Sequence, residues 1–222
     1  MIKGAIFDMD GLMLDTEKLL VRFWQQAAAE NGYNMTFQNV LDIRSLSRKY
    51  AIPRLKAIFG EQFDFMKIRA RRIELMNNYI NENGFEVKPG LFELLNYLRD
   101  NSFKIAVATA TDFERASLYL SKINAIDFFD EIICGNMIEN GKPEPDIYLT
   151  AAQKLGLEPN CCAALEDSPN GIESAYRAGC KVIMIPDLSQ PDQSVLPMLS
   201  AIYDRLDKAA EFFEKEKNNE RI

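Results

Sequence analysis

The stretch IKGAIFDMDG, residues 2–11, places a short apolar run directly before two acids and a glycine. The run Ile2–Phe7 has the length and composition of a buried parallel strand. Asp8 and Asp10 follow two positions apart, so their side chains point the same way while the chain stays extended. In doubly wound sheets, ligands bind beyond the carboxyl ends of the strands. The stretch therefore predicts the first strand of an α/β sheet, with an acidic pair at the end where ligands bind.

Four further apolar runs of strand length occur later in the chain. They are Phe103–Ala108, Glu131–Cys134, Cys161–Leu165 and Lys181–Ile185. Amphipathic segments with helical spacing separate them, and this alternation predicts an α/β fold with a doubly wound parallel sheet and right-handed crossovers. The tail Ala201–Lys217 has the pattern of a terminal amphipathic helix.

The alternation is interrupted once, between Asp15 and about Glu86. These roughly 70 residues show helical periodicity without a convincing strand, and they are much longer than an ordinary crossover between parallel strands. The segment is therefore interpreted as an inserted all-helical domain. The predicted domains are a catalytic core of residues 1–15 and 87–222 and a helical cap of residues 16–86. An insert directly after the acidic pair is placed to act as a lid.

Composition excludes several classes of protein. The formal charge of -7 over 222 residues argues against nucleic-acid binding, which needs a basic surface. No apolar run reaches the ~20 residues that cross a membrane. The four cysteines lack metal-ligand or disulfide spacing, so we expect a cytoplasmic protein with reduced thiols. The chain contains no histidine, which excludes Ser-His-Asp and Cys-His catalysis and HExxH zinc sites.

Any catalysis is therefore expected to rest on carboxylates, hydroxyl groups, lysine or a metal ion. Thr109-Ala110-Thr111 follows the second predicted strand, Glu166-Asp167 follows the fourth, and Lys142 lies in the loop after the third. These residues are expected to share one rim of the sheet with Asp8 and Asp10. Four carboxylates would repel one another in a partly desolvated pocket unless a cation bound between them. Oxygen ligands without histidine or cysteine favour Mg²⁺ over zinc.

Such a set of residues suits phosphoryl transfer. Asp8 can attack phosphorus while a cation lowers its repulsion from the phosphate. Asp10 can protonate the leaving alkoxide and later deprotonate the attacking water. The Thr109 hydroxyl and the backbone N–H groups around Ala110 can donate to phosphoryl oxygens, and Lys142 supplies a fixed positive charge.

At these residues the sequence closely resembles the haloacid dehalogenase-like hydrolase superfamily, in its branch with a helical cap. The matching stretches occur in family order and at family spacing, and they are Asp8-Met9-Asp10-Gly11 through Asp15-Thr16, Val107-Ala108-Thr109, Gly141-Lys142-Pro143 with Pro145-Asp146, and Leu165-Glu166-Asp167-Ser168 with Gly171. The resemblance covers the chain up to about Pro186. It implies a Rossmann-like core with a cap inserted between Asp15 and about Glu86.

The same resemblance implies specific roles. Asp8 would be the nucleophile and Asp10 the general acid and base, while Thr109 and Lys142 would stabilise the phosphate and the intermediate. Mg²⁺ would be held by Asp8, the backbone carbonyl of Asp10, Asp167 and, directly or through water, Glu166.

Substrate specificity is expected to come from the cap. Trp24 and Arg48 are candidate substrate contacts because they lie in stretches similar to the pocket-facing stretches of mutase-like members, and Thr111 is a candidate on the loop. The alternatives are that Trp24 belongs to the cap core and that Arg48 starts a surface helix. Three further arginines are expected to lie on a solvated helix face rather than to form a second phosphate site: Arg69, Arg71 and Arg72.

The predicted function is a Mg²⁺-dependent phosphatase that hydrolyses a small phosphate monoester, such as a sugar phosphate, through an aspartyl-phosphate on Asp8. One alternative is a phosphomutase similar to β-phosphoglucomutase, which Leu20 disfavours because mutase-like members carry a cap histidine near this position. A second alternative is a phospho-acceptor or binding module with little turnover, in which Asp10 and the cap would have no task. The expected partner is a small phosphorylated metabolite, without nucleic acid or membrane, and the protein is expected to be monomeric.

Overall fold

A six-stranded sheet organises the described part of the chain, and every neighbouring pair of its strands is parallel. It is seen in a computed structural model that describes residues 1–218. The strand order is β3-β2-β1-β4-β5-β6, and the strands are β1 (Gly4–Phe7), β2 (Lys104–Thr109), β3 (Glu131–Cys134), β4 (Cys162–Glu166), β5 (Lys181–Met184) and β6 (Leu199–Ile202). The chain winds from β1 first to one side of the sheet and then to the other. The predicted Rossmann-like, doubly wound α/β fold is confirmed.

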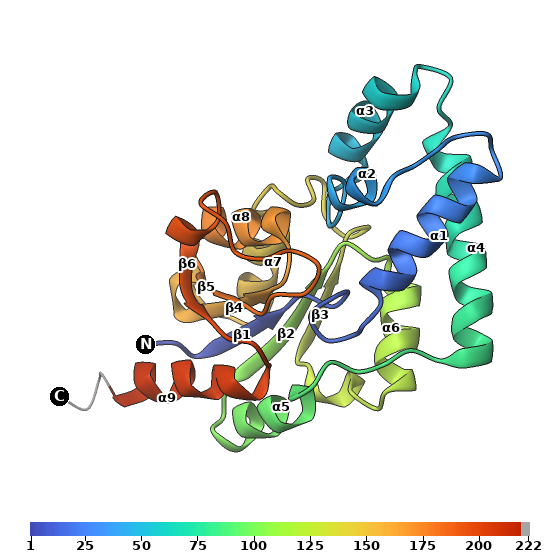
Figure 1. The fold of residues 1–222 in the computed structure, drawn as a ribbon. Helices are drawn as coiled ribbons and strands as arrows, with labels where there is room; N and C mark the ends of the chain where they lie inside the picture. The colour runs from blue at the N-terminus through green and yellow to red at the C-terminus, as the bar shows by residue number, and fades with distance from the viewer. Residues whose placement is uncertain (219–222) are drawn as a thin grey trace.

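Helices cover both faces of this sheet (Figure 1). One face packs against α5 (Leu91–Asp100), α6 (Phe113–Lys122) and α9 (Ala210–Asn218), and the other against α7 (Asp146–Lys154) and α8 (Pro169–Ala178). Successive residues of one strand contribute to opposite faces, as a strand requires. Phe7 packs into the first layer and Ile6 into the second, and neither is exposed. Burial on both faces explains why the strands are continuous apolar runs.

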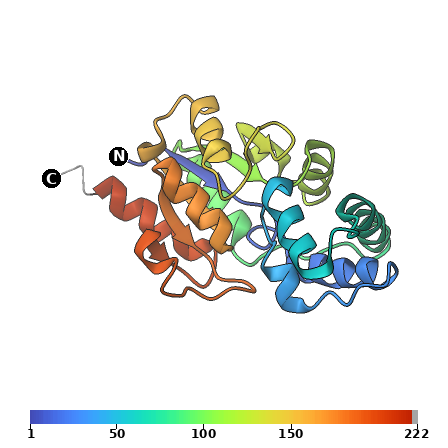
Figure 2. The same ribbon diagram turned by 90° about the horizontal axis from the view of Figure 1, so that it is seen from above.

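Four helices form an insert between β1 and α5. They are α1 (Glu17–Ala29), α2 (Phe37–Leu41), α3 (Arg48–Phe59) and α4 (Phe65–Asn83). The insert has a hydrophobic cluster of its own, in which Trp24, Leu55 and Phe63 are buried. It lies beside the sheet rather than on either of its faces (Figures 1 and 2). This helical insert corresponds to the segment that interrupts the strand–helix alternation of the sequence.

The five predicted strands are present, with ends that agree to within two residues, and a sixth was missed. Leu199–Ile202 forms β6, so the prediction of a helix from Ala201 was wrong, and α9 begins only at Ala210. Residues of β6 are alternately half-buried and exposed because it lies at the edge of the sheet. A four-residue edge strand offers little hydrophobic periodicity, which is the reason for the error.

Short 3₁₀ turns connect several elements: η1 (Ile126–Phe128), η2 (Pro159–Cys161), η3 (Leu196–Met198) and η4 (Asp207–Ala209). Helix α8 has a capped start, because the Ser168 hydroxyl accepts a hydrogen bond from the Gly171 N–H at 3.2 Å and Pro169 occupies the first helical position. Among residues 1–218, no helix combines the length and the apolar character needed to cross a membrane.

Candidate active site

A cavity of about 480 Å³ lies where the helical insert meets the carboxyl ends of the strands. Residues from both parts of the chain line it. The strand ends contribute Asp8 and Thr109, and the insert contributes Trp24 and Arg72. Its size is that of a site for a small molecule. The cavity therefore has reacting groups on one side and side chains of the insert on the other.

Asp8 and Lys142 form a buried ion pair at the base of this cavity. Asp8 directly follows β1, and its backbone N–H donates to the Leu165 carbonyl of the neighbouring strand. The Lys142 ammonium lies 2.5 Å from Asp8 Oδ1, and the same nitrogen lies 2.5 Å from Glu166 Oε1. Burial acts to lower the pKa of Lys142, but the two carboxylates outweigh it and raise that pKa above its ordinary value. Lys142 therefore remains a cation at physiological pH.

Glu166 ends β4 and is entirely buried, with hydrogen-bond donors at both oxygens. Oε1 accepts from Lys142 and from the Tyr148 hydroxyl, and Oε2 accepts from the backbone N–H of Asp167. A Cβ atom on Gly171 would lie only 1.9 Å from this carboxylate, so the first turn of α8 requires glycine there. Glu166 is thus held in one position by its surroundings.

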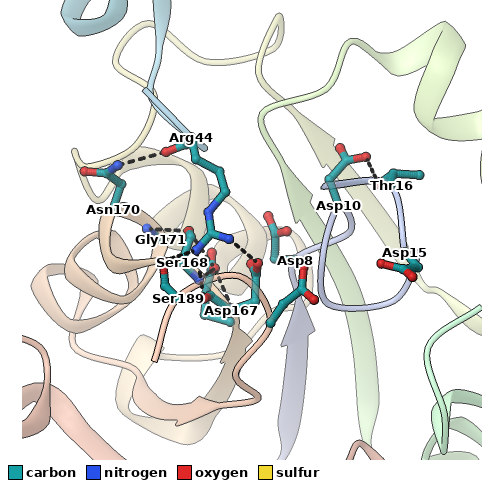
Figure 3. Close-up of polar contacts among 12 residues, drawn as sticks. Asp8, Asp10, Asp15, Thr16, Arg44, Asp167, Ser168, Asn170, Gly171 and Ser189 are labelled. Atoms are coloured by element: carbon teal, nitrogen blue, oxygen red, sulfur yellow. Dashed lines mark hydrogen bonds and ion pairs between the residues drawn. The ribbon is translucent and has the colours of Figure 1, made fainter. Parts of the chain in front are cut away.

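Asp167 is equally buried, but neither of its carboxylate oxygens accepts a hydrogen bond within residues 1–218. Its nearest cation is Arg44 of the insert, whose Nη1 lies 3.5 Å from Oδ2 (Figure 3). Burial raises the pKa of Asp167 to about 7, with a further increase from Glu166 that Arg44 opposes. Gly11 adopts a φ of +88°, and a Cβ atom there would lie 2.3 Å from Asp167 Oδ2. A buried carboxylate without donors is costly unless a cation binds it.

Three carboxylates fit a divalent cation. One oxygen each from Asp8, Glu166 and Asp167 lies within 4.8 Å of the others. Burial and the neighbouring carboxylates also raise the pKa of Asp8, against the effect of Lys142. A cation would relieve this repulsion, and Asp167 has free oxygens to bind it. Because all three donors are carboxylate oxygens, the set suits Mg²⁺ better than zinc or copper.

Asp10 is held differently from the other acids. Its Oδ1 accepts a hydrogen bond from the Thr16 hydroxyl at 2.5 Å (Figure 3), and its Oδ2 accepts from the Thr111 hydroxyl at 2.7 Å. Asp10 is half-buried and lines the cavity. Two hydroxyl groups thus orient this carboxylate while it remains accessible to a molecule in the cavity.

The residues at the end of β2 also reach the cavity. Thr109 is the last residue of the strand and is buried, whereas Ala110 is exposed. The Thr109 oxygen accepts a hydrogen bond from the Thr111 N–H at 3.1 Å. Thr111, a predicted substrate contact, lines the cavity, and its hydroxyl donates a hydrogen bond to Asp10 Oδ2.

Both predicted substrate contacts from the insert line the cavity. Trp24 also packs against Phe65 at 5.4 Å between ring centroids, so it belongs to the core of the insert as well. Arg48 begins α3, half of its side chain is exposed, and its Nη2 lies 3.4 Å from Asp112 Oδ1. For both Trp24 and Arg48, a position at the cavity is therefore compatible with the alternative structural role.

The expected solvated face of three arginines is wrong for two of them. Arg71 is on the outer side of α4 and forms ion pairs with Glu30 and Glu74. Arg72 is 5% exposed, and Arg72 and Arg69 both line the cavity. Consecutive helical residues are separated by about 100° around the axis, so Arg71 and Arg72 face different surroundings.

Two further cavity residues were not predicted from the sequence. Glu17, in the first turn of α1, is 2% exposed, and its Oε2 has no hydrogen-bond partner within the described residues. Arg44 joins the insert to the core through Asp167 and the Ser189 hydroxyl. Glu17 follows Asp8 and Asp10 closely in the sequence, and this proximity could have indicated its place in the cavity. Arg44 lies in an irregular segment, where no sequence pattern indicates a functional residue.

Comparisons with known proteins agree with this geometry. Residues 5–185 match the signature of the haloacid dehalogenase-like hydrolases. The chain is 32% identical over 190 residues to YhcW of Bacillus subtilis, which is named as a phosphatase, with 84% of each chain covered. It is 29% identical to a phosphorylated carbohydrates phosphatase of Thermotoga maritima, covering 82% of this chain and 84% of that one.

A solved structure, β-phosphoglucomutase of Clostridium difficile, superimposes with a TM-score of 0.81 at 25% identity, covering 100% of this chain and 99% of that one. The signature extends over most of the sequence, from β1 to the end of β5. The chain therefore belongs to the haloacid dehalogenase-like hydrolase family.

Proposed function

We propose that this hydrolase is a Mg²⁺-dependent phosphatase that acts on a small phosphate monoester, a sugar phosphate or a related metabolite, through an aspartyl-phosphate on Asp8. The observation that carries the proposal is the different environment of two carboxylates in one cavity. Asp8 is buried against Lys142, and Asp10 is accessible and held by the hydroxyl groups of Thr16 and Thr111. Such a pair can divide the reaction between a nucleophile and a proton carrier.

In the first step, an oxygen of Asp8 forms a bond to phosphorus and the ester P–O bond breaks. The leaving alkoxide takes a proton from Asp10, which must therefore begin this step protonated. The threonine hydroxyls at Asp10 donate hydrogen bonds, and they fix its orientation toward the leaving group. Lys142, the Thr109 hydroxyl and the backbone N–H of Ala110 offset the negative charge of the phosphoryl oxygens.

In the second step, Asp10 takes a proton from water as that water attacks the phosphorus atom bound to Asp8. The P–O bond to Asp8 breaks, inorganic phosphate leaves, and the Asp8 carboxylate is restored. Asp10 is then protonated again for the next substrate. Two carboxylates are needed because one group cannot be bonded to phosphorus and transfer the proton at the same time.

Mg²⁺, held by Asp8, Asp167, the backbone carbonyl of Asp10 and Glu166 directly or through water, would supply the charge that lowers the repulsion between Asp8 and the phosphate. The free oxygens of Asp167 support this assignment. The donors that surround Glu166 favour its contribution through water, because both of its oxygens are already engaged.

The helical insert is proposed to be a cap domain of residues 16–86 over a core of residues 1–15 and 87–222. Its separate hydrophobic cluster and its contribution to the cavity lining support this division. A cap of this kind excludes water while the phosphoryl group is transferred. The name of the Thermotoga relative supports a phosphorylated carbohydrate as the substrate class.

The proposed setting is the cytoplasm, with the protein acting as a monomer on a small metabolite rather than on nucleic acid or a membrane. All four cysteines are free thiols, which is compatible with a reducing compartment. The net charge of -7 disfavours a nucleic-acid partner.

A phosphomutase is the competing function, because the solved structure from Clostridium difficile is a β-phosphoglucomutase. Leu20 lines the cavity of this chain and offers no group that could transfer a proton there. Incubation with glucose 1-phosphate separates the two functions. A phosphatase releases inorganic phosphate, whereas a mutase yields glucose 6-phosphate without net phosphate release.

The decisive test of the phosphatase is the Asp8→Asn variant. We expect wild-type protein with Mg²⁺ to release phosphate from p-nitrophenyl phosphate over many turnovers, and the variant to release none above background. Circular dichroism and urea unfolding serve as the folding control. Substantial turnover by a folded Asp8→Asn protein would show that the nucleophile is misassigned, and a wild type without turnover would favour a binding module.

A further inference from the structure

Three arginines from two helices meet on the side of the cavity formed by α4 and α6. Arg69 and Arg72 come from α4 of the insert, and Arg115 comes from α6 of the core. All three line the cavity that also contains Asp8 and Asp10. None of them belongs to the phosphoryl-transfer groups described above. Their concentration in a protein of net charge -7 calls for an explanation.

Arg72 is the most unusual of the three because it is buried and, in the described part of the chain, has no carboxylate within ion-pair distance. Its guanidinium group stacks over the Trp24 ring at 5.2 Å, and its Nη1 lies 3.9 Å from the Met76 sulfur, a weak hydrogen-bond acceptor. Its Nε has no partner within residues 1–218. A guanidinium group carries five N–H donors, so most of its capacity is unused. Burying such a charge without an anion is unfavourable.

The charges nearby do not compensate for it. Asp112, at the start of α6, pairs with Arg69 at 3.0 Å and with Arg48 at 3.4 Å. Arg115 donates to the Thr111 hydroxyl at 3.2 Å and, within the described residues, has no carboxylate within 4.0 Å. Burial, with repulsion from Arg115 and Arg69, outweighs the attraction of the Asp10 carboxylate and lowers the pKa of Arg72 to about 9, so Arg72 is still charged at neutral pH. The cluster therefore keeps an excess of positive charge that faces the cavity.

A purely structural role explains Arg72 poorly. Its neighbour Arg71 has the contacts expected of an arginine with a structural role. It forms ion pairs with Glu30 and Glu74 on the outer surface. At the position of Arg72, an apolar side chain of similar length would pack against Trp24 and Met76 without the cost of burying a charge. An anion bound in the cavity would supply the partner that Arg72 lacks among the described residues.

We propose that Arg72 and Arg115, with Arg69 beside them, bind a second anionic group of the substrate, a phosphate or a carboxylate remote from the phosphoryl group that Asp8 attacks. This inference rests on the proposed phosphatase function and narrows its substrate class to doubly anionic metabolites. Planar guanidinium groups bind the oxygens of phosphate and carboxylate with paired hydrogen bonds. A cavity of about 480 Å³ accommodates a compound of sugar-phosphate size between the two anion sites.

The test compares compounds that differ in their second anionic group. Glucose 6-phosphate has none, 6-phosphogluconate adds a carboxylate, and glucose 1,6-bisphosphate adds a phosphate. Glycerol 3-phosphate and 3-phosphoglycerate form a shorter pair. Each is measured as a competitor of p-nitrophenyl phosphate hydrolysis, at constant free Mg²⁺ and ionic strength. We expect the doubly anionic member of at least one pair to have an inhibition constant about tenfold or more lower in the wild type.

Arg72→Met and Arg115→Met are the test variants, and Arg71→Met is the matched control. The preference for the doubly anionic member should fall by about tenfold in each test variant and remain as in the wild type in Arg71→Met. Arg115→Met keeps the test decisive if Arg72→Met does not fold. The relative affinities of 6-phosphogluconate and glucose 1,6-bisphosphate identify carboxylate or phosphate as the second group.

A wild type without preference in either size class would overturn the proposal, as would an equal loss of affinity for singly and doubly anionic compounds in both test variants. These outcomes are distinct from failure of the phosphatase itself. If the wild type did not hydrolyse p-nitrophenyl phosphate at all, the proposed function would be wrong. Binding of the same pairs, measured by calorimetry, would then decide whether the arginines select a second anion.

Discussion

Lys142 and Asp8 are joined by a salt bridge that is almost entirely buried. The Lys142 Nζ atom lies 2.5 Å from Asp8 Oδ1, and the two side chains are 0% and 4% exposed. The lysine comes from the loop after β3 and the aspartate from the end of β1, 134 positions apart in the chain. One cation thus positions the proposed nucleophile and offsets its charge, so it links the stability of the site to its chemistry.

Lys142→Met is expected to lower both activity and stability. The substitution preserves most of the side-chain volume but leaves Asp8 and Glu166 without their shared cation. Breaking a buried ion pair costs about 3–5 kcal/mol, and losing a group that stabilises developing charge reduces kcat by ~10²–10³-fold. Urea unfolding and phosphate release measure the two effects. Lys154→Met, on the exposed face of α7, is the control, and an unchanged unfolding free energy for Lys142→Met would contradict this account.

Asp10→Asn is expected to make the rate depend strongly on the leaving group. Without a proton from residue 10, a sugar alkoxide leaves poorly, whereas p-nitrophenolate needs little protonation. The loss in kcat should therefore be much larger for glucose 6-phosphate than for p-nitrophenyl phosphate. Thr111→Val, which removes one of the two hydroxyl groups that orient Asp10, should show a smaller loss with the same ordering. An equal loss for both substrates would argue against the role of Asp10 as an acid.

The core of the site could be predicted because it follows the strand ends. Asp8, Thr109 and Glu166 each end or directly follow a buried strand, and parallel strands bring their carboxyl ends to one edge. Lys142 is in a loop, so the periodicity of the sequence constrained its predicted position less than it did for the residues at the strand ends. Its burial between Asp8 and Glu166 is nevertheless what the balance of charge in that pocket requires.

The side of the site formed by the insert was predicted less well. Whether a helical arginine faces water or a cavity depends on how α4 packs. Arg69 and Arg72 line the cavity, whereas Arg71 pairs with Glu30 on the outer side of the helix. Arg44 precedes α3 in a segment without regular structure, yet it reaches Asp167 at 123 positions' distance. Contacts of this kind depend on tertiary packing rather than on local sequence pattern, which is why the sequence did not reveal them.

Asp167→Asn is expected to remove the response to Mg²⁺ while stabilising the metal-free protein. The wild type without metal carries a buried carboxylate whose oxygens accept no hydrogen bond among the described residues, close to Asp8 and Glu166. A neutral amide reduces that repulsion, and stability gained at the expense of function is common in active sites. Saturating Mg²⁺ at about 100 times its Kd would add ~2.7 kcal/mol to the wild type and little to the variant. Thermal unfolding at pH 8, with and without Mg²⁺, measures both effects.

The exposed Asp204 provides a control for this comparison, because Asp204→Asn changes the same charge far from any carboxylate cluster described here. Its response to Mg²⁺ should equal that of the wild type. If Asp167→Asn kept the full stabilisation by Mg²⁺, the assignment of Asp167 as a metal ligand would have to be abandoned.

Asp112→Asn is expected to weaken the contact between insert and core in a pH-dependent way. Burial acts to raise the pKa of Asp112, but the hydrogen bond and charge of Arg69, together with Arg115 and Arg48, outweigh it and lower that pKa below its ordinary value of 3.8. An acid with a lowered pKa in the folded state contributes stability above its unfolded pKa, and that contribution disappears as pH falls through the folded value. The variant should thus be less stable than the wild type by ~1 kcal/mol at pH 7, and the difference should shrink below pH 3.8.

Urea unfolding of both proteins at pH 7 and at pH 3 tests this dependence. Asparagine is as good a helix N-cap as aspartate, so the start of α6 is preserved and the ion pairs alone are lost. Asp127→Asn, at an exposed position on the core, is the control and should match the wild type at both pH values. The ion pairs with Arg48 and Arg69 also hold α3 and α4 against the core, so the variant should be cleaved faster by trypsin within the insert at pH 7. A stability difference that stayed constant down to pH 3 would show that Asp112 acts through packing rather than through its charge.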